Sequence, residues 1–224
     1  MLQTLIIFEV NDVIITSKKS IEDILEMLKP YNKIFVGGCG TCSTSCMTGG
    51  EEQVNEMVEI LGDRAVAGHV FEEPCDIRLV KRDLKEVKDK IEEAEVILEL
   101  CCGAGAQVVS EVTEKFVLPG CDTIFLGETI RIGRFQELCK MCGQCVLHET
   151  GTICPLTRCA KGLINGPCGG YAEGKCEVGN YENDCAWCLI YEQLKKFDRL
   201  DLFVKPTLPR DWSIKSSPQK IMLR

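Results

Sequence analysis

The apolar positions between residue 20 and about residue 128 follow two patterns that alternate along the chain. Apolar residues three and four apart predict helices, and short continuous apolar runs predict buried strands. The expected helices are a short one between Ser20 and Pro30, one opened by Thr48, and the stretches 81–91 and 107–112; the expected strands are 33–36, 65–71, 96–100 and 123–126. This alternation predicts an α/β fold with a small, mostly parallel, doubly wound sheet, right-handed crossovers and helices on both faces.

Two of the expected helices carry start signals. Ser20 is followed three residues later by Asp23, and Thr48 is followed three residues later by Glu51. A hydroxyl side chain at the start of a helix accepts a hydrogen bond from an early backbone N–H, so both pairs predict capped helix starts.

The pattern changes at Glu137. From there to residue 184 the chain has short turns rich in glycine, proline and cysteine, without periodicity. Asn183 and Asp184 are expected to cap a last helix, whose apolar stripe is Trp187, Ile190, Tyr191 and Leu194. Beyond Leu202, three prolines favour an extended tail that wraps over the domain or a partner. We therefore expect an α/β domain over residues 1–130 and a loop-dominated domain over residues 131–224.

Composition narrows the classes of function. Of the 224 residues, 45% are hydrophobic, which is enough for a core. The formal charge of -8 has the wrong sign for binding nucleic acid or anionic lipid through bulk electrostatics, so neither partner is expected. No apolar run approaches the roughly 18 residues that cross a bilayer. The opening MLQTLIIFEV lacks the basic start of a signal peptide, so we expect a cytoplasmic location.

Sixteen cysteines dominate the chemistry of the chain. Disulfides are disfavoured in the reducing cytoplasm, where a dense set of thiols is typical of metal binding. We therefore expect most of these cysteines to bind metal, and we expect residues 131–224 to be a Cys-rich metal-binding domain.

The first group of cysteines lies in GGCGTCSTSC, directly after the strand expected at 33–36. It contains Cys39, Cys42 and Cys46, and the G-x-G-x-x-G pattern of a dinucleotide site is absent there. In a doubly wound sheet this turn lies at the edge where ligands bind. A fourth ligand is expected at the same edge: Cys75 after the second strand, or Cys101 or Cys102 after the third. Four thiolates at one edge predict a cubane iron–sulfur cluster.

Nine more cysteines lie between residues 139 and 188. Cys139, Cys142 and Cys145 have the C-x2-C-x2-C spacing of ferredoxins, in which a tight loop brings three thiolates to one cubane. The other six are Cys154, Cys159, Cys168, Cys176, Cys185 and Cys188. Nine thiols supply two four-thiolate sites with one left over. We expect two cubanes, with one cubane and one zinc ion as the alternative, and spacing leaves the pairing of ligands open.

The two histidines are weaker candidates for metal ligands. His148 continues the cysteine spacing and is compatible with a zinc site of three thiolates and one imidazole, but a solvent-facing position is expected. His69 lies within a strand, where we expect it to pack or to form a hydrogen bond. Neither has a nucleophile and an orienting group nearby in sequence, so hydrolytic catalysis is not indicated.

The motifs of the second group resemble a known family. The stretch 139–194 contains GQCVL, TGTICPLTRCAKGL, NGPCGG, GKCEV and DCAW, and it resembles the methylenetetrahydrofolate reductase C-terminal-type domain. That domain occurs in the small, V-type subunit of the bacterial reductase. The segments GGCGTCSTSC and CCGAGAQ also resemble this subunit, so the likeness covers most of residues 13–213.

The resemblance assigns positions to most of the cysteines. Those of the C-terminal motif are Cys139, Cys142, Cys145, Cys154, Cys159, Cys168, Cys176 and Cys185, and those of the N-terminal motif are Cys39, Cys42, Cys46 and Cys102. Three cysteines, Cys101, Cys121 and Cys188, fall outside the pattern and are expected to be plain buried thiols.

The resemblance also implies a partner and a role. The partner is a flavin-bearing TIM-barrel subunit that reduces methylenetetrahydrofolate in one-carbon metabolism of the Wood–Ljungdahl type, and it alone holds FMN or FAD. This chain is then a non-catalytic iron–sulfur subunit with one N-terminal and one or two C-terminal [4Fe–4S] clusters. It docks on the catalytic flavoprotein and passes electrons to or from the flavin, and an electron-donor protein is a further partner.

Two alternatives remain open at the level of sequence. The chain is also compatible with a zinc-stabilised structural module that docks the catalytic subunit without carrying electrons. An independent enzyme could use an open iron corner of the N-terminal cluster as a Lewis acid, which requires a site with only three protein thiolates.

Overall fold

The computed structural model describes residues 13–222, and these divide into two compact units with the boundary between Gln136 and Glu137. We call them unit 1 and unit 2 and describe each by itself. The division lies somewhat beyond the boundary expected between residues 130 and 131. The reason is that two strands near the boundary form a hairpin that joins a sheet of unit 1.

Unit 1 is built on a parallel sheet of four strands in the order β3-β2-β4-β5. The strands are β2 (Ile34–Cys39), β3 (Ala65–Phe71), β4 (Val96–Leu100) and β5 (Val117–Pro119). The parallel sheet confirms the expected α/β fold. The first three strands match the predicted ones, but β2 runs three residues further, because the two glycines after Val36 continue the strand.

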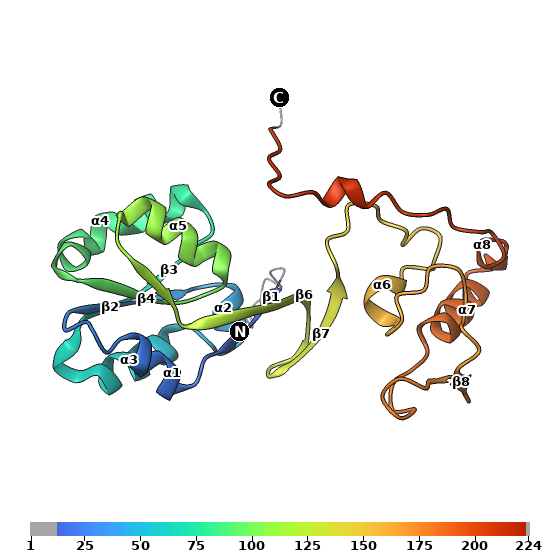
Figure 1. Cartoon of the computed structure of the whole chain (residues 1–224), viewed down its shortest axis with the longest axis horizontal. Coiled ribbons are helices and arrows are strands. Elements are labelled where there is room, and N and C mark those ends of the chain that lie inside the picture. The colour runs from blue at the N-terminus through green and yellow to red at the C-terminus, as the bar shows by residue number, and fades with distance from the viewer. Residues whose placement is uncertain (1–12, 223–224) are drawn as a thin grey trace, which may run out of the picture. The chain divides into compact units, whose positions relative to one another are not determined.

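Helices cover both faces of this sheet, as Figure 1 shows for α4 and α5 on one side and α1 and α3 on the other. They are α1 (Ile21–Met27), α3 (Glu51–Leu61), α4 (Ile77–Glu93) and α5 (Gly103–Thr113), with the short α2 (Cys42–Ser45) and the 3-10 turn η1 (Gly62–Arg64) between them. Ile34 and Val36 of β2 pack with α1 and α3, whereas Phe35 packs with α4 and α5. Alternate residues of a strand face opposite sides, so one strand contributes to both apolar clusters.

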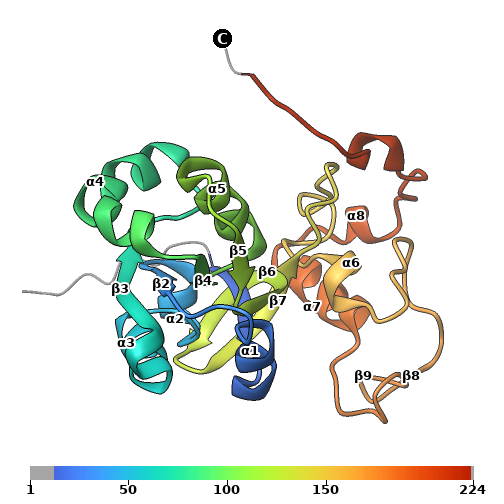
Figure 2. The same cartoon turned by 60° about the vertical axis from the view of Figure 1, so that its left-hand side comes forward.

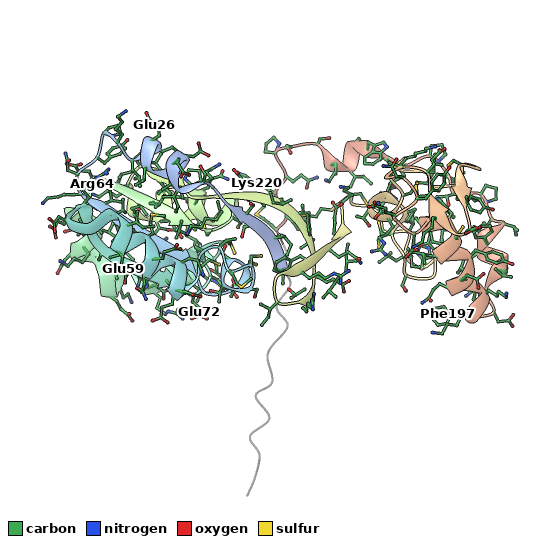
Figure 3. All side chains as sticks on the ribbon, turned by 90° about the horizontal axis from the view of Figure 1, so that it is seen from below. Glu26, Glu59, Arg64, Glu72, Phe197 and Lys220 are labelled. Atoms are coloured by element: carbon green, nitrogen blue, oxygen red, sulfur yellow. The ribbon has the colours of Figure 1, made fainter. Side chains whose placement is uncertain are left out.

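Polar positions of the helices face outward. Glu26 of α1 and Glu59 of α3 are exposed, and both are labelled in Figure 3. The predicted helices at 81–91 and 107–112 are both longer in the structure. The start of α4 lies further upstream because the Asp76 side chain accepts a hydrogen bond from the Arg78 backbone N–H at 2.8 Å and caps the helix there.

Of the two expected caps, one is confirmed and one is wrong. The Ser20 hydroxyl accepts a hydrogen bond from the Asp23 N–H at 3.0 Å and begins α1. Helix α3 instead begins after Gly50, whose N–H donates to Gln53 Oε1 at 3.1 Å. Thr48 is drawn away from the helix because its hydroxyl bonds that of Thr16 at 2.6 Å.

The strand expected at 123–126 exists, but its place in the parallel sheet was wrongly predicted. It belongs to β6 (Cys121–Arg131), which lies between β1 (Val13–Lys18) and β7 (Arg134–Cys139) in a second sheet. The pairing of β6 with β1 is antiparallel. Much of β6 is exposed, unlike β2 and β4, so it suits a half-covered antiparallel sheet. The fourth parallel strand is the short β5.

Unit 2 has little regular structure. Its elements are α6 (Pro155–Arg158), β8 (Tyr171–Ala172), β9 (Lys175–Cys176), α7 (Ala186–Lys196), α8 (Leu200–Phe203) and the 3-10 turn η2 (Trp212–Lys215) (Figure 2). Helix α7 confirms the predicted last helix, but its N-cap is Cys185 and not Asn183 or Asp184. Trp187, Ile190 and Leu194 are buried as expected.

Tyr191 is the exception in the expected apolar stripe of α7. It is 38% exposed and packs edge-on against Phe203 of α8. The tail is largely extended and is held along unit 2 by reciprocal hydrogen bonds between Asn165 and Thr207, at 2.7 and 3.0 Å. Among residues 13–222, no helix has both the length and the apolar character that crossing a bilayer demands.

Candidate metal centres

Three neighbouring parallel strands of unit 1 end in turns that contain cysteines. The register pairs Cys39 with Phe71 of β3, and Gly38 with Leu100 of β4, so all three strands end at one edge of the sheet. Cys39 is the last residue of β2, Cys75 lies in the turn after β3, and Cys102 is the N-cap of α5 after β4. The topology therefore brings the turns that carry these thiols together.

The thiols at this edge are close enough to influence one another. Burial raises the pKa of the Cys42 thiol, and the nearby Cys39 and Cys102 raise it further. Burial also raises the pKa of the exposed-side thiol of Cys75, again with contributions from Cys102 and Cys39. Cys39, Cys42, Cys75 and Cys102 thus form one electrostatic neighbourhood, which we call the edge cluster.

Close backbone packing holds the Cys39–Cys46 loop at this position. The Cys39 N–H donates to the Gly49 carbonyl at 2.8 Å. Gly49 in turn lies so close to β4 that a Cβ atom on it would be 1.6 Å from the Leu100 carbonyl oxygen. Only glycine permits this approach, and it brings the loop next to the turn that contains Cys102.

Donor groups point at two sulfurs of the edge cluster. The Ile14 N–H donates to Cys42 Sγ at 3.4 Å, and the Thr41 hydroxyl lies 3.4 Å from Cys39 Sγ. Hydrogen bonds to sulfur favour the thiolate over the thiol and tune any metal that the thiolate binds.

The third cysteine of the loop, Cys46, is directed elsewhere. Its thiol donates to the Ile14 carbonyl at 3.7 Å, and its side chain packs with Val13 and Ile15 of β1. Burial raises its pKa, although Cys39 is close enough to contribute. Cys46 therefore belongs as much to the packing of β1 as to the edge cluster.

Cys101 and Cys121 are buried thiols. Burial raises the pKa of Cys101 far above its usual range, and it raises that of Cys121 to about 12. The Cys101 thiol donates to the Cys102 carbonyl at 3.1 Å, and the Cys121 thiol donates to the Thr48 carbonyl at 3.6 Å. Both sulfurs are held in the protonated form.

In unit 2, the first four cysteines lie around the start of α6. Met141 and Gly143, both with positive φ, turn the chain between Cys139, Cys142 and Cys145. Cys154 is the N-cap of α6. This helix is tied to the end of β7 by a hydrogen bond from the Thr157 hydroxyl to the Leu138 carbonyl, at 3.3 Å.

Two of these sulfurs accept hydrogen bonds. The Met141 N–H donates to Cys139 Sγ at 3.2 Å, and Arg210 Nη2 donates to Cys142 Sγ at 2.8 Å. The Arg210 guanidinium also donates to the Gln144 carbonyl. A cation from the tail is therefore in contact with a sulfur of the ferredoxin-like trio, where it would offset the negative charge of a thiolate site.

The remaining five cysteines lie around the start of α7. Cys159 follows α6 and packs against the apolar cluster that contains Cys185. The Cys176 N–H donates to the Asn183 carbonyl at 2.8 Å, and the Cys185 N–H donates to the Gly174 carbonyl at 2.7 Å. The β8–β9 hairpin is thereby joined to the residues that lead into α7.

Cys168 lies in the loop before this hairpin. The Gly170 N–H donates to Cys168 Sγ at 3.4 Å, and Lys161 Nζ lies 3.5 Å from the same sulfur. These two donors hold the pKa of the Cys168 thiol below its usual range despite some burial. Lys161 also forms an ion pair with Glu177, which follows Cys176, so Cys168 and Cys176 are linked through one lysine.

The donor chemistry fits thiolate-bound metal, but the ligands are not preassembled. As the side chains stand in residues 13–222, no three Cys, His, Asp or Glu side chains form a metal-binding group. The thiols at both ends of the chain are nevertheless gathered, and several accept N–H hydrogen bonds. Soft thiolate donors with such hydrogen bonds suit iron–sulfur clusters or zinc.

Neither histidine joins these groups. The His148 side chain is 77% exposed and lies 3.8 Å from Glu149. The His69 ring packs edge-on against Phe71, with a centroid distance of 5.0 Å. Its Nε2 is buried and has no hydrogen-bond partner within the described residues.

The sequence analysis missed Glu99 of β4. Its side chain is fully buried, and burial raises the pKa of its carboxyl to about 8. Within residues 13–222 its oxygens form no well-oriented hydrogen bond, although the Cys101 thiol lies near. Gly37 of β2 pairs with it and leaves the room, since a Cβ atom there would be 1.8 Å from Glu99 Oε2. The signal was a lone acid inside the apolar run VILEL.

Arg210 was also missed, because nothing in the tail indicates which sulfur it reaches. Comparison with curated proteins and with solved structures finds no significant match. Residues 118–213 match the model of one protein family, described as methylene-tetrahydrofolate reductase C terminal. This match includes all nine cysteines of unit 2 but not the edge cluster, and it agrees with the family that the C-terminal motifs resemble.

Proposed function

We propose that the chain is an iron–sulfur subunit of a methylenetetrahydrofolate reductase complex that transfers electrons and docks on the catalytic subunit. The observation that carries the proposal is the gathering of Cys39, Cys42, Cys75 and Cys102 at the ligand-binding edge of a parallel sheet. The family match of residues 118–213 supports the assignment to that reductase.

The four thiols of the edge cluster are the best-placed ligands for the N-terminal [4Fe–4S] cluster. They come from three turns, and each turn is fixed by a strand end. Cys75 supplies the fourth ligand in this proposal, and Cys46 stays in contact with β1. When bound, such a cluster accepts and releases single electrons.

In unit 2, the four cysteines around the start of α6 are the best-placed ligands for a second cluster. They are Cys139, Cys142, Cys145 and Cys154. Arg210 and the Met141 N–H contact two of these sulfurs and would raise the reduction potential by stabilising added negative charge. The position of Arg210 also means that the tail orders this site.

The proposed partner is the flavin-bearing catalytic subunit, which holds FMN or FAD and the folate substrate. The chain would deliver electrons to that flavin, or take them from it, one at a time, and an electron-donor protein would exchange them at the other end. The cytoplasm is the proposed location, since free thiol ligands persist there.

The test begins with the full chain purified without oxygen. Iron and acid-labile sulfide should be present in cubane proportions, and the reduced protein should give the paramagnetic resonance of [4Fe–4S]⁺. Cys75→Ser and Cys102→Ser should each remove one cluster, whereas Cys121→Ser, a buried thiol in the same unit, should keep the full iron content. A colourless chain that holds zinc alone would refute electron transfer and favour the zinc-stabilised docking module.

The complex is tested by co-expression with the catalytic flavoprotein of the reductase. We expect the two chains to purify together, and we expect the flavin to be reduced more slowly through the Cys102→Ser chain than through the Cys121→Ser control. A partner flavin that is reduced equally fast in both complexes would contradict the proposed relay.

A further inference from the structure

The thiol of Cys188, which lies outside the family-like cysteine pattern, is in contact with that of Cys185. The two residues begin α7, with Cys185 as the N-cap and Cys188 one turn into the helix. Their side chains are joined by a hydrogen bond, and burial together with this neighbour raises the pKa of Cys188 to about 11. Both pack on the apolar cluster of Trp187, Ile190 and Leu194, so the helix holds the pair in place.

The closeness of these two sulfurs distinguishes between kinds of metal site. Two thiolates on one tetrahedral zinc ion, each with a Zn–S bond of about 2.3 Å, lie about 3.8 Å apart. Contact between two thiols is of comparable length. In a cubane, each iron takes one protein thiolate, and the four thiolates point outward from different corners, so they lie further apart. A hydrogen-bonded pair of thiols therefore fits two ligands of a single ion.

Two further cysteines lie beside this pair. Cys159 packs against the same apolar cluster. Cys176 is brought to the start of α7 by its N–H hydrogen bond to Asn183, two residues before Cys185. Cys168 has a different set of contacts, to Lys161 and to the Gly170 N–H, in the exposed loop before the hairpin.

We propose that Cys185 and Cys188 bind one zinc ion together with Cys159 and Cys176. The inference rests on the metal-binding role proposed for unit 2 and adds both the kind of metal and a ligand to it. Binding would release the protons of the four thiols to solvent and leave a closed, tetrahedral site. Such a site would fasten α6, the β8–β9 hairpin and α7 to one another.

The test is metal analysis and zinc X-ray absorption of the full chain, purified without oxygen. We expect one zinc ion per wild-type chain with four sulfur neighbours, alongside the cluster iron. Cys188→Ser should lose most of this zinc while it keeps its iron. Cys188→His should keep the zinc with three sulfurs and one nitrogen at about 2.0–2.1 Å, a replacement that only a true ligand position permits.

Two controls separate the possible failures. Cys121→Ser, in unit 1, and Cys168→Ser, in the exposed loop, should both keep four-sulfur zinc. A wild-type chain that contains cluster iron but no zinc would overturn this inference and leave the electron-transfer proposal intact. Zinc that stays four-sulfur in Cys188→Ser would also overturn it, whereas a chain without iron would refute the electron-transfer proposal separately.

Discussion

The buried carboxyl of Glu99 should make the stability of unit 1 depend on pH. Burial raises its pKa from 4.5 to about 8 in the folded chain. The folded state therefore binds this proton more tightly than the unfolded state does. The resulting destabilisation is absent below about pH 4.5, grows as the pH rises and is complete above about pH 8.

The size of the effect follows from linkage. Within this window, one proton taken up by the folded state alone changes the free energy of unfolding by about 1.4 kcal/mol per pH unit. Glu99→Gln removes the titration but keeps the size and shape of the side chain. Between pH 5.5 and 7.5, the wild-type chain should lose about 3 kcal/mol of stability relative to this variant.

The assay is urea unfolding followed by far-ultraviolet circular dichroism at several pH values. Wild-type and variant chains should have the same metal content, so that pH effects on metal binding cancel in the difference. Glu86→Gln, an exposed position on α4, is the matched control and should follow the wild-type chain. A constant difference between wild type and Glu99→Gln from pH 5.5 to 7.5 would show that Glu99 does not titrate as burial requires.

Three further predictions concern packing and metal removal. Gly37→Ala should cost about 1–3 kcal/mol, because its Cβ would lie 1.8 Å from Glu99 Oε2, and a Glu99→Ala background should reduce that cost in a double-mutant cycle; an unchanged cost would contradict the contact. Gly49→Ala should lower the iron content of the edge cluster without affecting that of unit 2, because the new Cβ would meet the β4 backbone at 1.6 Å; full iron loading would argue against this packing. A strong chelator should shift the fluorescence of Trp187 and Trp212, the only tryptophans, both in unit 2, while the helical signal of unit 1 persists; a joint loss of both signals would show that the units unfold together.

The best-predicted elements are those whose residues are buried on both faces. The run 96–100 was assigned to the residue because all five side chains are buried and leave no ambiguity of pattern. The run 123–126 was assigned as a strand but to the wrong sheet, because a short apolar run does not show which neighbour it pairs with. Thr48 failed as a cap because a distant partner, Thr16, competes for its hydroxyl.

The candidate site was predictable in position but not in detail. Cysteines that follow successive strands must share a sheet edge if the strands are parallel and adjacent, and the structure has that arrangement for β3, β2 and β4. Spacing gives no direction for a side chain, however. It does not show that Cys46 faces β1, nor that Arg210 reaches Cys142 from the tail. Both facts depend on contacts between residues far apart in sequence.

The origin of the edge cluster in three separate turns has a consequence for biogenesis. No short peptide of unit 1 contains the whole set of Cys39, Cys42, Cys75 and Cys102, so the receptacle exists only once β2, β3 and β4 have paired. A scaffold protein that delivers an inorganic cofactor here would have to act on an already folded acceptor. Unit 2 has only a small apolar cluster around α7, so its maturation should run in the opposite order, with the metal arriving first and the loops settling around it.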